Sequence, residues 1–213
     1  DADVGLVGPL IASVHPRATH KDAKQVFDAL GGIVSPGLID MHMHIESSMI
    51  TPAAYVAEVL PRGVTTLVWD PHEFGNTCGT LGVEYAVQAA KDSSIRVLTL
   101  APSCVPSAPG YETTGGDFTA EVVNSLLANP DIHGVAEVMS MQAVLDRNER
   151  ISSIVQAGLE AGKRVCGHAR GLTGGELNAY VVSGVETDHE LISGADLVEK
   201  LQAGLTIELR GSH

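Results

Sequence analysis

The chain has 213 residues, 44% hydrophobic and 18% charged, a composition that predicts a compact globular domain and excludes a disordered chain. Its 26 acidic residues outnumber 13 Lys and Arg, for a formal net charge of -13, and this excludes nucleic acid as a partner because phosphates would be repelled. No apolar run approaches the roughly 20 residues needed to cross a bilayer, and the acidic start is unlike a signal peptide, so we expect no membrane partner.

The spacing of the three cysteines indicates the redox conditions under which the protein works. Cys78, Cys104 and Cys166 lie far apart, with no CxxC spacing, which indicates neither a disulfide framework nor a structural zinc site. We therefore expect the protein to work in the reducing cytoplasm.

The first 32 residues differ from the rest of the chain. Two short apolar segments, residues 4–6 and 11–15, flank Gly8-Pro9, and this pattern predicts a β-hairpin. A hairpin has too few strands to bury a core alone. We therefore assign residues 1–32 to part of a small β domain, of the β-sandwich kind, and residues 33–213 to the main domain.

From about residue 33 onward, short β-branched segments alternate with amphipathic helical ones, which is typical of βα units around a parallel sheet. The pattern predicts an α/β fold of the TIM-like (β/α) barrel type, whose active sites lie at the C-terminal ends of the strands. A doubly wound open sheet is the structural alternative. The predicted strands are 33–44, 63–70, 96–101, 132–139, 164–169, 185–189 and 205–209. The predicted helices lie near 52–61, 81–91, 118–128, 151–161, 175–182 and 195–202.

The predicted strands are one fewer than the eight of a complete barrel. The last of them runs into the C-terminus, so we expect a barrel that lacks its eighth strand and a chain that is a fragment of a longer protein. If these residues were the whole protein, exposed strand edges and severely impaired catalysis would be expected.

The strongest local signal is residues 36–44, Pro-Gly-Leu-Ile-Asp-Met-His-Met-His, an apolar strand that ends in two histidines. Because side chains alternate along a strand, His42 and His44 point to one side. They could both bind one metal, with Asp40 as a supporting carboxylate.

Other residues of metal-binding type fall at equivalent positions. Glu137, His168 and His189 follow or end three later predicted strands. A buried histidine with a structural role explains any one of these positions. It does not explain their repetition at one end of the predicted barrel, which favours a metal site there.

Residues 36–49, Pro-Gly-Leu-Ile-Asp-Met-His-Met-His-Ile-Glu-Ser-Ser-Met, resemble the amidohydrolase superfamily and, within it, the bacterial adenine deaminases. The match is long and distinctive. Further resemblance lies in residues 68–76, Val-Trp-Asp-Pro-His-Glu-Phe-Gly-Asn, and in residues 101–107, 166–171 and 207–213, so that it covers nearly the whole chain.

The resemblance implies a binuclear divalent-metal centre. In it, His42 and His44 come from the first strand, Glu137 bridges the metals where many relatives use a modified lysine, and His168 and His189 complete the set. The resemblance implies manganese or iron rather than zinc, whereas carboxylate and imidazole ligands alone leave all three open. The family's aspartate at the end of the eighth strand, which binds metal and serves as acid and base, has no counterpart in this chain.

The implied reaction is hydrolytic deamination of adenine to hypoxanthine and ammonia, as in purine salvage, by water whose pKa the metal lowers. The partner is then a small purine base, and we also expect a homo-oligomer. The alternatives are another amidohydrolase, acting on cyclic amides or N-acetyl sugars, and an inactive metal-binding fragment. Residues 44–46 match the H-x-E of the cytidine-type zinc deaminases, but the companion P-C-x-x-C is absent, which excludes that class.

Polar residues beside the strand ends are secondary candidates. Asp70, His72 and Glu73 could form an auxiliary cation site or bind the purine, and a capped polar loop is the alternative. Glu46 could contact the purine edge, with a surface loop residue as the alternative. Arg170 could orient the purine, with an ion pair inside an acidic mouth as the alternative.

Overall fold

The computed structural model describes residues 1–16 and 22–211. The chain divides into two compact units, Asp1–Pro36 and Gly37–His213. The last two residues of the segment 207–213 lie outside the described residues. Within the described ranges no helix combines the length and the apolar character that a bilayer crossing requires.

The first unit contains the predicted hairpin. Strands β1 (Ala2–Val7) and β2 (Leu10–Pro16) pair antiparallel, and Gly8 in the turn has a φ of 58°, which glycine adopts without the penalty of a side chain. Leu6, Leu10 and Ile11 are exposed. The hairpin is confirmed, and its assignment to a β-sandwich stays a prediction.

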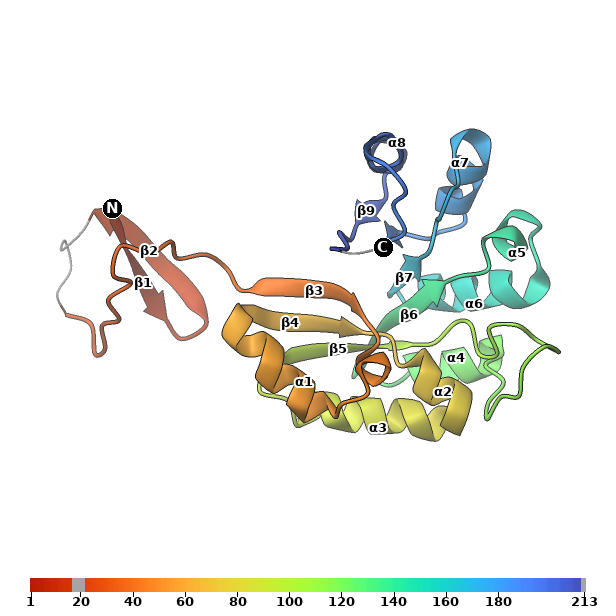
Figure 1. Ribbon diagram of the computed structural model, residues 1–213, viewed down its shortest axis with the longest axis horizontal. Coiled ribbons are helices and arrows are strands. Elements are labelled where there is room, and N and C mark those ends of the chain that lie inside the picture. Colours follow the sequence, from red (N-terminus) through yellow and green to blue (C-terminus); the bar gives the residue numbers. More distant parts are fainter. Residues whose placement is uncertain (17–21, 212–213) are drawn as a thin grey trace. The chain divides into compact units, whose positions relative to one another are not determined.

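The second unit is built on parallel strands, and each of the predicted strand segments contains one (Figure 1). The order along the main sheet is β3-β4-β5-β6-β7, with β8-β9 as a separate pair. Neighbours in the sheet are neighbours in the sequence, with no reversal of order, as in part of a TIM-like barrel and unlike a doubly wound sheet. The strands are β3 (Leu38–Met43), β4 (Val64–Trp69), β5 (Arg96–Ala101), β6 (Ile132–Val138), β7 (Arg164–Gly167), β8 (Thr187–Asp188) and β9 (Thr206–Ile207).

The first predicted strand, 33–44, is too long at its start. Pairing with β4 begins at Leu38, whose N–H donates to the Gly63 carbonyl at 2.8 Å. Ile33 is 98% exposed. Pro36 explains the late start, since proline has no N–H to donate to a neighbouring strand.

Helices connect the strands where the periodicity predicts them: α1 (Pro52–Val59) followed by η2 (Leu60–Arg62), α3 (Thr80–Lys91), α4 (Ala120–Leu127), α6 (Glu149–Glu160), α7 (Gly174–Val182) and α8 (Gly194–Ala203). Three short elements were not predicted: η1 (Ile45–Ser48), α2 (His72–Cys78) and α5 (Met141–Leu145). They are too short to show a helical period, and α2 contains residues of low helix propensity such as Gly75 and Thr77.

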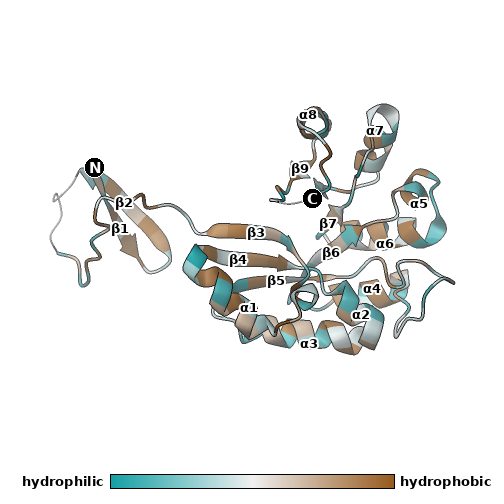
Figure 2. Ribbon diagram, in the orientation of Figure 1, coloured by the Kyte–Doolittle hydropathy of each residue, from teal (hydrophilic) through white to brown (hydrophobic). Residues whose placement is uncertain are grey.

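Apolar packing between the helices and the sheet holds the strand ends in place. Figure 2 shows the strands of the sheet mainly in the hydrophobic colour. Ile154 of α6 is fully buried in this core. A Cβ on Gly158 would meet side-chain methyl carbons of Val135 and Val165 at 2.7 Å, so α6 lies close against β6 and β7 because this position has no side chain.

Candidate metal centre

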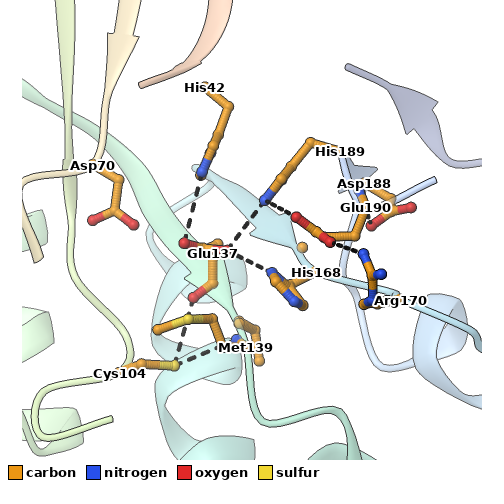
Figure 3. Close-up of polar contacts among 12 residues, drawn as sticks. His42, Asp70, Cys104, Glu137, Met139, His168, Arg170, Asp188, His189 and Glu190 are labelled. Carbon is orange, nitrogen blue, oxygen red and sulfur yellow. Dashed lines mark hydrogen bonds and ion pairs between the residues drawn. The ribbon is translucent and has the colours of Figure 1, made fainter. Parts of the chain in front are cut away.

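The candidate ligands come from the C-terminal ends of several parallel strands. His42 lies in β3, Glu137 in β6, and His168 and His189 directly follow β7 and β8. Strand ends meet at one edge of a parallel sheet, so residues distant in the sequence become neighbours. Figure 3 shows His42, His168 and His189 pointing toward the carboxylate of Glu137.

The Glu137 carboxylate lies between four imidazoles. Its Oε1 is 3.6 Å from His42 Nε2 and 3.3 Å from His44 Nε2. Its Oε2 is 2.8 Å from His168 Nδ1 and 3.3 Å from His189 Nε2. Each oxygen therefore faces two histidines, the arrangement expected of a carboxylate shared between two ions.

These separations fit the coordination of divalent metals. Two ligands bound about 2.1 Å from one ion lie about 3.0 to 3.4 Å apart, and His42 Nε2 is 2.9 Å from His44 Nε2. Imidazole with carboxylate suits zinc, iron and manganese. Among the described residues, three groups of side chains have donor atoms within 4.8 Å of one another: His44, Asp70, His72 and Glu137; His42, His189 and Glu208; and Glu137, His168 and His189.

The electrostatics of the site compensate for a buried negative charge. Glu137 is only 4% exposed; burial alone would raise its pKa, but the hydrogen bond from His168 and the three other imidazoles around the carboxylate hold this pKa well below its usual range. Burial would lower the pKa of His44, but Glu137 and Asp70 raise it to about 9. The raised pKa favours the protonated form of His44 in the metal-free site, so a metal must compete with a proton for this ring.

Buried hydrogen bonds fix the backbone around Glu137. Ser103 Oγ donates to the Glu137 carbonyl at 2.5 Å, and Cys104 Sγ accepts from the Met139 N–H at 3.4 Å. The Tyr180 hydroxyl donates to the Val138 carbonyl at 2.8 Å and accepts from the His168 N–H at 3.0 Å. Tyr180 thus joins the end of β6 to the end of β7.

The structure brings two of the three secondary candidates after β4 to the centre. Asp70 is buried, and its Oδ2 is 3.0 Å from His72 Nδ1; burial would lower the pKa of His72, but this carboxylate raises it. His72 Nδ1 lies 3.9 Å from Glu137 Oε1. Glu73 instead accepts from Ser47 Oγ at 2.6 Å. His72 and Glu73 begin α2 rather than lying in a loop.

The other secondary candidates have partners of their own. Glu46 Oε2 accepts from Trp69 Nε1 at 2.7 Å, and burial raises the pKa of Glu46. Arg170 pairs with Glu190 Oε2 at 2.7 Å (Figure 3), which is the ion pair that we gave as the alternative for Arg170. Asp40 supports β3 through the His42 N–H at 3.3 Å rather than through an imidazole ring.

Sequence reasoning missed Glu208. It follows β9 directly, is 5% exposed, and places Oε2 3.7 Å from His189 Nδ1. Both its carboxylate oxygens and His189 Nδ1 are buried without a hydrogen-bond partner among the described residues. Burial raises the pKa of Glu208 to about 7. Its place near the end of the predicted strand 205–209 was the signal that could have identified it.

Comparison with known proteins identifies the family. Residues 33–212 match the Amidohydrolase family, and the chain belongs to this family. Adenine deaminase 2 of Rhizobium etli is 62% identical over 213 residues, which are 100% of this chain and 36% of the relative. The adenine deaminase of Serratia proteamaculans is 53% identical, with the same coverage of 100% and 36%. The chain thus spans about 36% of the length of these relatives.

Solved structures share the fold. A mutant of atrazine chlorohydrolase from Arthrobacter aurescens, solved with zinc and atraton, has a TM-score of 0.64 at 16% identity and covers 97% of this chain and 66% of its own. A solved amidohydrolase has a TM-score of 0.55 at 17% identity, with coverage of 95% and 59%. At these identities the likeness concerns the fold alone.

Proposed function

We propose that the protein containing this chain is a metal-dependent hydrolase that deaminates adenine to hypoxanthine and ammonia. The observation that carries the proposal is the Glu137 carboxylate, with His42 and His44 on one oxygen and His168 and His189 on the other. The similarity to adenine deaminases over the full chain supports the choice of substrate.

We propose that this cluster holds two divalent ions, manganese or iron in preference to zinc. His42 and His44 would hold one ion and His168 and His189 the other, with Glu137 shared. When bound, such ions supply Lewis acidity that lowers the pKa of water toward neutrality. The preference for manganese or iron rests on the resemblance to the adenine deaminases.

Residues of the chain would also orient the substrate and handle protons. Asp70 engages Nδ1 of His72 at 3.0 Å, and the same nitrogen lies 3.9 Å from Glu137 Oε1, so His72 would give or take a proton through a ring that Asp70 orients. Glu46 and Arg170 are proposed purine contacts, since Glu46 Oε1 has no hydrogen-bond partner among the described residues and the Arg170 side chain is 53% exposed. A carboxyl oxygen and a guanidinium suit the donors and acceptors of a purine edge.

We also propose the biological setting of the protein. The partner would be a free purine base rather than nucleic acid or membrane, the protein a homo-oligomer of the cytoplasm, and the role purine salvage. The division into a β domain, 1–32, and a barrel domain, 33–213, remains our proposal for the domain organisation.

The test combines metal analysis with an assay of ammonia release from adenine, on the protein as encoded, including any residues beyond these 213. Glu137→Gln should lose metal and activity together by more than about 100-fold, since loss of supporting groups alone costs about 10- to 100-fold. Glu84→Gln, at an exposed position of α3, is the matched control and should behave as wild type. A wild type that binds metal and cleaves cyclic amides but not adenine would establish the alternative amidohydrolase.

A further inference from the structure

The two histidines that face Glu137 Oε2 follow strands that are not paired with each other in a sheet. His168 follows β7, at the edge of the five-stranded sheet, whereas His189 follows β8 of the separate pair. One backbone hydrogen bond, from the Glu186 N–H to the Val165 carbonyl at 3.0 Å, links the two segments before the histidines. Nearer the centre, the links are made by side chains.

Two side chains of β8 accept from the backbone of β7 and the residues that follow it. Thr187 Oγ1 accepts from the Gly167 N–H at 3.1 Å, and Asp188 Oδ1 accepts from the Ala169 N–H at 2.6 Å. Asp188 Oδ1 also accepts from the Glu190 N–H at 3.1 Å. One carboxylate oxygen therefore holds the residue after His168 and the residue after His189.

Asp188 is itself paired with a buried lysine of α8. Both Asp188 and Lys200 are 0% exposed, and Lys200 Nζ donates to Asp188 Oδ2 at 2.7 Å. The ammonium also reaches the Glu190 carbonyl at 3.1 Å and Asp196 Oδ2 at 3.0 Å. These three partners match its three N–H donors. A buried charge is costly unless it is paired and hydrogen-bonded, as both charges are here.

We propose that Asp188 and Lys200 form a positioning pair for the metal centre. Lys200 fixes the carboxylate of Asp188, and this carboxylate fixes the chain beside His168 and His189, so that His168 Nδ1 and His189 Nε2 face one oxygen of Glu137 (Figure 3). Without Lys200, Asp188 would be a buried charge that must recruit water or move. The inference rests on the proposed metal centre but not on adenine as the substrate.

Titration of metal-free protein, as encoded, with Mn²⁺ tests the pair, with free Mn²⁺ followed by its EPR signal. Lys200→Met should weaken one of two Mn²⁺ equivalents by about 10- to 100-fold, the usual effect of losing a supporting group, and change the other by less than about 3-fold. The control is Lys91→Met, at an exposed ion pair with Asp131, which should bind both equivalents as wild type does. Equal affinities in Lys200→Met and wild type would overturn the proposal.

Two double variants decide the matter even if Lys200→Met does not fold. Asp188→Asn with Lys200→Met removes both charges of the pair but keeps an oxygen that can accept from Ala169 and Glu190, and the Asp196 carboxylate is the same in both double variants. Asp188→Ala with Lys200→Met removes that oxygen as well. The first should keep the affinity of the sensitive equivalent and the second should lose it. Equal affinities in both would overturn the proposal, whereas wild-type protein that binds no Mn²⁺ would contradict the proposed metal centre itself.

Discussion

The main sheet and the β8–β9 pair place metal-competent residues by different means. Strands β3 to β7 pair along a continuous sheet, and apolar side chains such as Ile154 and Val135 fill the space between this sheet and its helices. Strands β8 and β9 have two residues each. Around them lie buried polar residues: Thr187, Asp188, His189, Glu190, Asp196, Lys200 and Glu208.

The residues of one site are therefore held in place by two kinds of interaction, apolar packing and buried hydrogen bonding. Apolar packing depends little on the direction of each contact but strongly on the volume of the buried side chains. Buried polar networks are sensitive to the loss of any single partner, because the remaining group stays buried without compensation. A change in core volume under the main sheet should therefore lower the free energy of unfolding more than it disturbs the metal site, whereas the position of His189 should be sensitive to changes in charge and hydrogen bonding.

The largest effect on stability is expected from Ile154→Ala, which leaves a cavity where a 0% exposed side chain of α6 packs. Such substitutions cost about 3 to 4 kcal/mol of unfolding free energy, measured here by urea unfolding. Mn²⁺ affinity of the folded protein should stay near wild type, since no polar partner is lost. Leu159→Ala, at a more exposed position of the same helix, is the control with a smaller loss. A Mn²⁺ affinity that falls as far as in Lys200→Met would break the comparison.

Glu208→Gln should change the pH dependence of stability in the metal-free protein. Burial raises the Glu208 pKa from 4.5 to about 7, so the folded state holds more protons than the unfolded state between these values. Wild-type stability therefore falls as pH rises through this window, by up to about 3 kcal/mol, and the penalty stays constant above it. Glutamine carries no such penalty.

Urea unfolding of both proteins from pH 4 to pH 8 isolates this effect, because the other titrating groups are common to both. The stability of Glu208→Gln relative to wild type should rise with pH across the window and then level. A difference that does not change with pH would show that burial of Glu208 is not what distinguishes the β8–β9 region.

Tyr180→Phe should cost about 1 to 3 kcal/mol of unfolding free energy, because the Val138 carbonyl and the His168 N–H both lose a buried partner. The affected backbone lies at the edge of the sheet that adjoins β8. This variant therefore tests whether apolar packing or buried hydrogen bonding holds His168 in place. Mn²⁺ titration should show weakening of the equivalent held by His168. A lower free energy of unfolding with no change in either Mn²⁺ affinity would show that Tyr180 stabilises the fold, as the apolar core does, without positioning a ligand.

The sequence predicts the parts of this molecule that depend on local pattern. A period of two ending in His42 and His44, and βα units of regular spacing, are properties of adjacent residues. The C-terminal ends of parallel strands meet, so Glu137, His168 and His189 could be expected at one place before any contact was known. The helices α2 and α5 are too short to show a period.

The burial of charged residues around β8 and β9 could not be predicted in this way. Lys200 follows Asp196 by four residues on α8, a spacing that ordinarily indicates an exposed ion pair on a helix surface. Its burial depends on how α8 packs against the residues after β8, which is a tertiary contact. Glu208 is similar, because a glutamate after a short strand acquires its meaning only from the imidazole of His189 beside it.

The smallest effect is expected from Arg164→Met, and it sharpens the comparison most directly. Arg164 pairs with Glu186 at 2.5 Å, with side chains 64% and 38% exposed, and so links β7 to the residue before β8, as Asp188 does inside the protein. Exposed pairs contribute about 0 to 1 kcal/mol and are screened by salt, so urea unfolding should change by no more than this and Mn²⁺ affinity not at all. If Arg164→Met instead weakened one Mn²⁺ equivalent as Lys200→Met is expected to do, any link between these strands would suffice, and burial of the Asp188 and Lys200 charges would not be what positions His168 and His189.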